Sequence, residues 1–139
     1  MDEIAARHAS EQALKNHRPD FEAFFLARLL NLRFDYPDQQ CVITFELKDF
    51  MFNPQGSLHG GIIATVMDIS MGHLLNRMQG PGTTLEMKTQ YVKAARTGAI
   101  RCCGELIKLG QGISFLRSTM TDAEGDVVAF ATATWKRLK

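Results

Sequence analysis

The sequence lacks the features that mark membrane, secreted and nucleic-acid-binding proteins. No apolar run approaches the roughly 18 residues that a membrane span needs. The opening residues, MDEIAARHAS, show no basic segment followed by an apolar one, so they do not predict a signal peptide. A net charge of +1 is too small to favour nucleic acid or an anionic membrane as a partner. We therefore expect a cytoplasmic protein with no nucleic acid and no membrane among its partners.

Cysteine is also scarce, and its placement excludes two further classes. The 3 cysteines are an odd number without metal-ligand spacing, which favours a reducing compartment over a disulfide framework. Cys102 and Cys103 would point to opposite faces of a strand, so we interpret them as packing residues. The glycines at 60 and 61 are not followed by the Gly-Lys-Ser/Thr ending of a phosphate-binding P-loop. We expect no cofactor and no metal.

What the chain does contain is enough apolar sequence for one core. Its 139 residues, 45% of them hydrophobic, predict a single domain over 1–139. Periodicity predicts helical segments in residues 1–30, two strands between 32 and 47, and a long helix from about 58 to 77. Four more strands follow at 84–92, 99–109, 113–121 and 126–138. One long helix for about six strands predicts the α+β class, with a curved antiparallel sheet wrapped around a central helix.

The N-terminal segment predicts two helices. Residues 1–17 form a polar pattern with a weak apolar stripe, in which His8 and His17 are expected to be solvated. Asp20 is expected to cap the second helix, which follows Pro19. That helix carries an apolar stripe, which we interpret as core, although it could cover a pocket or a subunit contact. The stripe consists of Phe21, Phe24, Phe25 and Leu29.

The stretch from Asn53 to Asn76 is the most unusual part of the sequence. It passes through a His-Gly-Gly turn into a helix that is apolar almost all the way round, the pattern of a buried helix. One carboxylate, Asp68, interrupts it. Because burying an unpaired carboxylate is expensive, Asp68 must face a cavity, meet a polar partner or lie at a subunit boundary. The alternative is a structural aspartate bonded to Ser70 or to a strand hydroxyl.

The start of the same helix offers backbone amides to a ligand. Gly60 and Gly61 occupy positions whose N–H groups have no partner within the helix, at the positive end of its dipole. Without side chains, they let a carbonyl oxygen that becomes an oxyanion approach closely. The alternative is that the glycines permit close packing of the helix on a strand.

These two features cannot act on one substrate from a single chain. Gly60 and Asp68 are eight positions apart, so about 12 Å separates them along the helix axis, whereas catalytic contacts are about 3 Å long. If both are catalytic, the acid must come from a second copy of the chain. The sequence then predicts a homodimer with two composite sites, built on antiparallel central helices.

With these residues in view, the chain resembles the hotdog-fold acyl-CoA thioesterases. The resemblance covers roughly residues 32–138 and is closest to small phenylacetate-pathway-type enzymes and mammalian thioesterase superfamily member 2. It implies a hotdog fold, an acyl-CoA substrate, hydrolysis to free acid and CoA, and dimers often paired into homotetramers. The matching residues are Asn53, Gly56, Leu58, His59, Gly60, Gly61, Asp68, Gly82, Thr83, Thr84 and Gly98.

The resemblance also assigns roles to residues. Asp68 matches the acid that serves as general base or as nucleophile, and the Gly60 N–H matches the donor to the thioester carbonyl. His59 and Asn53 match polar residues on the side of that donor, although His59 could equally make a structural hydrogen bond in its turn. Thr84 matches a hydroxyl that orients the water or the acid. Gly61 and Thr83 complete the residues expected to contact substrate. His73 has no counterpart, and we interpret it as structural.

Two alternatives and one open question remain. A hotdog dehydratase or hydratase would use a histidine and an acid on acyl thioesters, but the longer motif around its histidine is not visible. A non-catalytic acyl-CoA-binding protein would keep the pocket without turnover, and Asp68 with Thr84 speaks against it. The acyl group is not determined by the sequence. Candidates for binding the CoA phosphates are Lys93, Arg96, Lys108, Arg117, Lys136 and Arg137.

Overall fold

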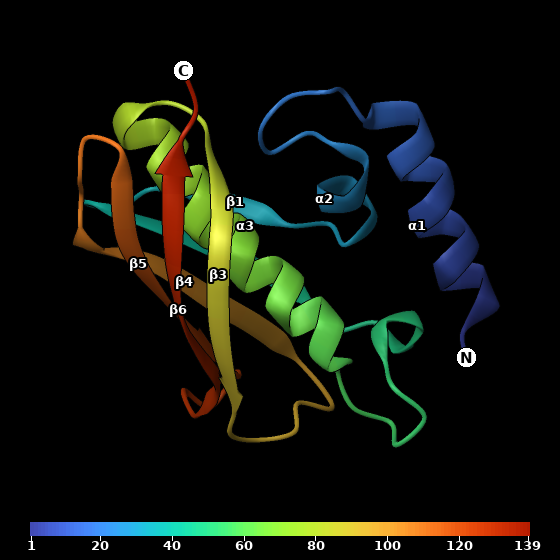
Figure 1. Cartoon of the computed structure of the whole chain (residues 1–139). Helices are drawn as coiled ribbons and strands as arrows, with labels where there is room; N and C mark the ends of the chain where they lie inside the picture. Colours follow the sequence, from blue (N-terminus) through green and yellow to red (C-terminus); the bar gives the residue numbers. More distant parts are fainter.

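A computed structural model describes residues 1–139 and shows a curved sheet wrapped around one long helix (Figure 1). The sheet is antiparallel and six-stranded, in the order β1-β2-β4-β5-β6-β3. This confirms the predicted α+β class and the arrangement that the hotdog resemblance implies. The elements are α1 (Glu3–Asn16), α2 (Phe25–Leu29), β1 (Arg33–Asp35), β2 (Gln40–Glu46), the 3-10 turn η1 (Asp49–Met51), α3 (Gly60–Gln79), β3 (Gly82–Tyr91), β4 (Ala99–Lys108), β5 (Ile113–Thr121) and β6 (Val127–Arg137).

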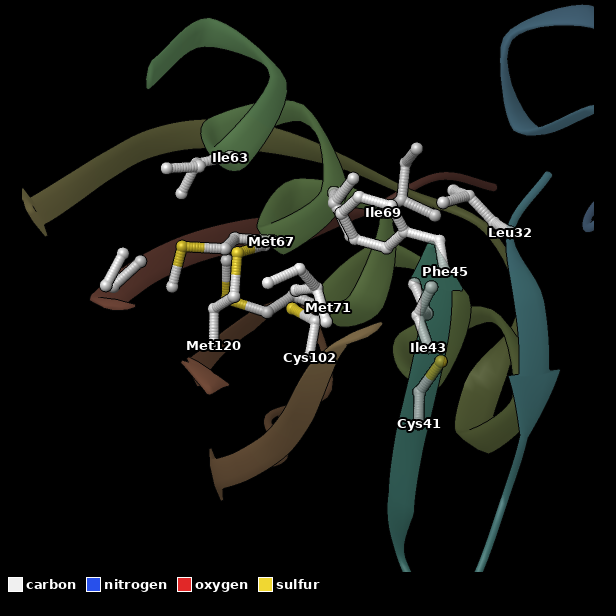
Figure 2. Close-up of a cluster of buried hydrophobic side chains, with 14 of the residues drawn as sticks. Leu32, Cys41, Ile43, Phe45, Ile63, Met67, Ile69, Met71, Cys102 and Met120 are labelled. Atoms are coloured by element: carbon white, nitrogen blue, oxygen red, sulfur yellow. The ribbon is translucent and has the colours of Figure 1, made fainter. Parts of the chain in front are cut away.

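Helix α3 is the centre of the core, because it is buried over most of its length. Figure 2 shows Met67 and Met71 of this helix meeting Met120 of β5 and Cys102 of β4. The helix lies so close to β4 that a Cβ at Gly104 would come within 2.6 Å of the Ser70 backbone oxygen. The Ser70 hydroxyl is buried here, and its hydrogen bonds are satisfied: it donates to the Met67 carbonyl and shares a hydrogen bond with the Ser118 hydroxyl.

Cys102 and Cys103 are packing residues, as predicted. Cys41, Cys102 and Cys103 are free and buried, and none forms a disulfide. Burial raises the pKa of Cys41 to about 12 and that of Cys102 to about 11, so both stay protonated thiols at neutral pH. No helix of the structure combines the length and the apolar character that crossing a membrane would require.

The N-terminal segment lies beside the sheet rather than inside its curve (Figure 1). Helix α1 is capped at its start by Asp2, whose side chain accepts from the Ala5 N–H. The second helix is shorter than predicted, and Asp20 does not cap it, since α2 begins only after Phe24. The reason is Glu22, whose φ of 70° lies in the left-handed region and breaks any helix through it.

This turn also changes which phenylalanines of the predicted apolar stripe are buried. Phe21 and Phe25 are 45% and 38% exposed, so the interpretation of these two rings as core is wrong. Phe24 is half-buried and packs against the core. Once the chain turns at Glu22, the rings that a continuous helix would align on one face point in different directions.

Candidate active site

Asp68 lies half-buried on α3, where its carboxylate meets a hydroxyl from the neighbouring strand. The Thr84 Oγ1 donates to Asp68 Oδ1 at 2.7 Å. Ser70 does not contact Asp68, since its hydroxyl turns toward Ser118 on the other side of the helix. The partner of the acid is thus a strand hydroxyl, which bonds to only one of the two carboxylate oxygens.

The rest of the Asp68 carboxylate faces a cavity of about 610 Å³. The cavity lies against one side of α3, between the helix, strand β3 and the turn that precedes α2. Its walls are mainly apolar, with polar groups gathered near Asp68, which is the usual composition of a small-molecule site. The lining residues are, from α3, Ala64, Thr65, Asp68, Ile69, Gly72 and His73; from β3 and β6, Gly82, Thr83, Thr84, Met87 and Trp135; and from the N-terminal segment, Phe21, Phe24 and Leu26.

Burial raises the pKa of Asp68 above its ordinary value, while the hydrogen bond from Thr84 opposes that shift. A raised pKa makes the carboxylate a stronger base than an exposed aspartate, provided that it is ionised. A carboxylate of this kind in a cavity is a candidate for general-base chemistry.

A bulge in β3 aims Thr84 at the acid. The pairing of β3 with β6 shifts register between Thr84 and Glu86, so Leu85 is the extra residue and is 52% exposed. Before the bulge, Thr84 faces the helix, and after it Met87 does. Strict alternation would place these two residues on opposite faces of the strand.

The other end of the predicted site lies at the start of α3. The His59 Nδ1 accepts from the Gly61 N–H at 2.8 Å, so this imidazole caps the helix. The Gly60 N–H has no hydrogen-bond partner in the chain. Tyr91 of β3 donates to the Gly60 carbonyl at 2.9 Å and so ties the first residue of the helix to the sheet. Of the two glycine amides, the one at Gly60 is available to a ligand.

Asn53 lies in the loop before α3, and its side chain is engaged within that loop. Its Oδ1 accepts from the backbone N–H groups of Gln55 and Ser57, at 3.0 and 3.2 Å. Its Nδ2 donates to the Ser57 hydroxyl at 3.0 Å. Arg96 supports the same loop by donating to the carbonyls of Gln55 and Gly56. In a single chain, Asn53 therefore shapes the loop that leads into the glycine turn.

The structure thus brings the predicted residues together as two groups. Asp68, Thr83 and Thr84 border the cavity, whereas His59 and Gly60 lie at the helix start, nine and eight residues before Asp68. The 20-residue helix α3 is unbroken between them, so the axial separation of about 12 Å holds. One chain contains two halves of a site that do not meet.

Comparison with known proteins places the chain in a family. A model of the thioesterase superfamily matches residues 55–129, which include both halves of the site. The chain belongs to the thioesterase superfamily. A comparison with curated proteins gives no match.

Several solved structures share the fold of this chain. The Escherichia coli PaaI protein from the phenylacetic acid degradation operon is 16% identical, with a TM-score of 0.81 over 94% of this chain and 96% of that one. The Streptococcus mutans protein smu.793, solved bound to acetyl-CoA, is 25% identical, with a TM-score of 0.73 over 76% and 87%. A hypothetical thioesterase from Streptococcus pneumoniae is 25% identical, with a TM-score of 0.73 over 76% and 89%.

In this thioesterase-superfamily chain, sequence reasoning missed several residues that line the cavity. Trp135 of β6 packs over Gly72, where a Cβ would come within 2.6 Å of its ring. A signal for this face exists in the helix, because Ala64 and Gly72 lie one turn before and after Asp68 and are both small. Nothing in the local sequence pointed to Trp135.

Three of the basic residues suggested for the CoA phosphates have other partners. Lys93 forms ion pairs with Asp122, Glu124 and Asp126, with N–O distances of 2.8, 3.5 and 2.7 Å. Arg96 is committed to the carbonyls of the loop before α3. The Arg117 Nη2 lies 3.6 Å from Glu105 Oε2, an ion-pair distance. The remaining candidates are Lys108, Lys136 and Arg137.

Proposed function

We propose that this protein is an acyl-CoA thioesterase that hydrolyses the thioester to a free acid and CoA. The observation that carries the proposal is the pair of half-sites on α3: an unpartnered Gly60 N–H at the helix start, and Asp68 with a raised pKa in a cavity beside Thr84. Membership of the thioesterase superfamily and the acetyl-CoA bound to smu.793 are consistent with a CoA thioester as substrate.

In the proposed mechanism, each half-site supplies one requirement of acyl transfer. The Gly60 N–H and the positive end of the helix dipole stabilise the oxyanion that forms from the thioester carbonyl. Asp68 of the partner subunit takes a proton from a water molecule, and the water oxygen attacks the carbonyl carbon. The C–S bond then breaks, and the CoA thiolate receives the proton. Thr84 keeps the carboxylate oriented through its hydrogen bond.

The composite site requires a homodimer, and the sheet has an edge suited to one. Strand β3 is ten residues long and lies at the end of the sheet, paired only with β6. A long exposed edge strand presents unpaired backbone groups, and native proteins usually cover or pair such an edge. Pairing of two β3 strands would set the two α3 helices antiparallel, with Gly60 of one chain facing Asp68 of the other. Sedimentation measurements should then give a dimer, or a tetramer formed from two dimers.

The activity is tested by release of free thiol from a panel of acyl-CoAs. Wild type should release CoA, and Asp68→Asn should lower kcat about 10²- to 10⁴-fold, the usual contribution of a general base. Asp38→Asn is the matched control, because Asp38 is exposed and has a φ of 53°, which asparagine also adopts. A wild type that binds acyl-CoA without releasing thiol would instead be a binding protein. An active Asp68→Asn variant would remove Asp68 from the mechanism.

A further inference from the structure

His73 is a buried histidine of α3 that the proposed mechanism does not use. Its side chain lies among aromatic rings, stacked on Phe34 at 4.8 Å between ring centroids. Its Nε2 accepts a 2.9 Å hydrogen bond from the Glu22 backbone N–H, 51 residues away in the sequence. An Nε2 that accepts a hydrogen bond carries no proton, so this imidazole is neutral.

Glu22, whose N–H bonds to His73, is the residue at which the N-terminal segment turns. Glu22 has the left-handed φ of 70°, and its carboxylate accepts from the Tyr36 hydroxyl. The Arg77 guanidinium lies 4.4 Å from the centre of the Tyr36 ring. The turn is closed by the Arg18 N–H, which donates to the Ala23 carbonyl at 2.8 Å. Glu22 is thus fixed through its backbone and through its side chain.

This turn places two aromatic rings in the wall of the cavity that contains Asp68. Phe21 and Phe24 precede and follow the fixed residue, and both line the cavity. Their ring centroids lie 4.9 and 6.0 Å from that of His73. At these distances the rings interact with the imidazole as aromatic pairs. The cavity therefore has polar groups around Asp68 and an aromatic wall anchored to the central helix.

We infer that Phe21 and Phe24 determine which acyl groups this site accepts, and that His73 is the residue that positions them. The inference rests on the proposed thioesterase function, since it assigns the cavity to the acyl group. With the carbonyl beside Asp68, the acyl group extends toward the aromatic wall. A short apolar acyl group is accommodated there. A chain that extends as far as the wall must displace a phenyl ring, and moving the turn that carries these rings would break the hydrogen bond from the Glu22 N–H to His73, leaving a part-buried donor unsatisfied.

The wall is tested by comparing acetyl-CoA with decanoyl-CoA in Phe21→Ala and Phe24→Ala. The ratio of kcat/KM for the long over the short substrate should rise about tenfold or more in each, because changes of methylene size in apolar pockets alter discrimination 10- to 200-fold. Phe25→Ala is the matched control, an exposed phenylalanine of the same segment that does not line the cavity. It should keep the wild-type ratio. Unchanged ratios in both Phe21→Ala and Phe24→Ala would overturn the inference.

The positioning role is tested with two substitutions of His73. His73→Leu removes the acceptor for the Glu22 N–H and should relax the ratio as Phe21→Ala does. His73→Gln keeps an acceptor oxygen and should restore discrimination toward wild type. A histidine that only supports the fold would lower stability in both variants without changing the ratio. A wild-type ratio in folded His73→Leu would therefore disprove the positioning role.

Binding of non-hydrolysable analogues separates this inference from the proposed function. S-ethyl and S-decyl thioethers of CoA cannot be hydrolysed, so their dissociation constants report the cavity without turnover. Wild type should prefer the S-ethyl compound, and Phe21→Ala should lose that preference. If this pattern holds while no thioester is hydrolysed, the thioesterase proposal is wrong, and the inference that Phe21 and Phe24 select the acyl group is supported. If hydrolysis occurs but substitution of Phe21 or Phe24 changes neither the binding preference nor the kcat/KM ratio, the inference about these residues is wrong and the thioesterase proposal is supported.

Discussion

The Thr84 hydroxyl donates a 2.7 Å hydrogen bond to Asp68 from the residue next to the bulge in β3. Bulges re-aim side chains, and they are over-represented beside active sites. Here the bulge allows a strand residue to reach the one carboxylate of α3.

Removing the Thr84 hydroxyl should move the pH dependence of hydrolysis. Burial raises the pKa of Asp68, and the bond from Thr84 lowers it by stabilising the ionised form. Thr84→Val therefore raises this pKa further, so the acidic limb of the kcat/KM profile should shift to higher pH. The matched control is Thr89→Val, a half-buried threonine of the same strand without a hydrogen bond to Asp68. Identical acidic limbs for wild type and Thr84→Val would exclude Asp68 as the titrating base.

The role of the Gly60 amide can be tested by removing one N–H group. Gly60→Pro deletes the donor, and proline is well tolerated at the first position of a helix. The preceding residue, His59, has φ −61° and ψ 134°, a conformation compatible with a following proline. We expect kcat to fall about 10²- to 10³-fold, the usual cost of losing an oxyanion donor.

Gly60→Ala is the control for this substitution, because it adds a Cβ and keeps the N–H. That Cβ would come 3.3 Å from the Tyr91 ring, so a small displacement of the ring must be tolerated. The alanine variant should stay much closer to wild type than the proline variant. Equal losses in both would show that shape at this turn, and not its hydrogen-bond donor, matters.

Mixing two inactive variants tests whether the site is shared between chains. In a heterodimer of Asp68→Asn and Gly60→Pro protomers, one composite site carries both changes and the other carries neither. An equimolar mixture that exchanges freely should be half heterodimer and recover about a quarter of wild-type activity, by counting sites. A site contained within one chain would give no recovery. The measurement is thiol release after unfolding and co-refolding of the two variants.

The sequence predicted the central helix and its acid well, because a helix that is apolar on all sides is unambiguous and one carboxylate within it stands out. It also indicated that the two halves of the site are separated, since helical rise alone determines that distance. The roles of Asp68 and Gly60 remain predictions. The resemblance pointed to Thr84, but alternation along the strand would put Thr84 and Met87 on opposite faces, and alternation cannot reveal the bulge that places both toward the helix.

The aromatic wall was not predictable from local pattern for a different reason. Phe21 and Phe25 show helical spacing, but Glu22 adopts a left-handed conformation that no local preference demands. That conformation coexists with a hydrogen bond to His73, a residue 51 positions away. Tertiary contacts of this kind override propensity, so the turn and the residues it places in the cavity become visible only in three dimensions.

The same buried histidine should make the protein lose stability in mild acid. Burial lowers the pKa of His73 from an ordinary 6.5 to about 4, with the Glu22 carboxylate and the Ile69 backbone opposing that shift. Between these two pH values, the unfolded chain binds a proton at this residue and the folded chain does not. Stability due to His73 is therefore complete above pH 6.5 and is lost as pH falls toward 4.

Urea unfolding at pH 7 and pH 4.5 measures this loss. Wild type should lose ~2–3 kcal/mol more than His73→Gln over this interval, because each pH unit within the window contributes about 1.4 kcal/mol. The comparison with His73→Gln is needed because carboxylates also begin to titrate near pH 4.5. Asp68, whose pKa is raised, acts in the opposite direction and is present in both proteins. Equal losses in the two proteins would show that His73 is not the group responsible, and that its contact with Glu22 does not require a neutral ring.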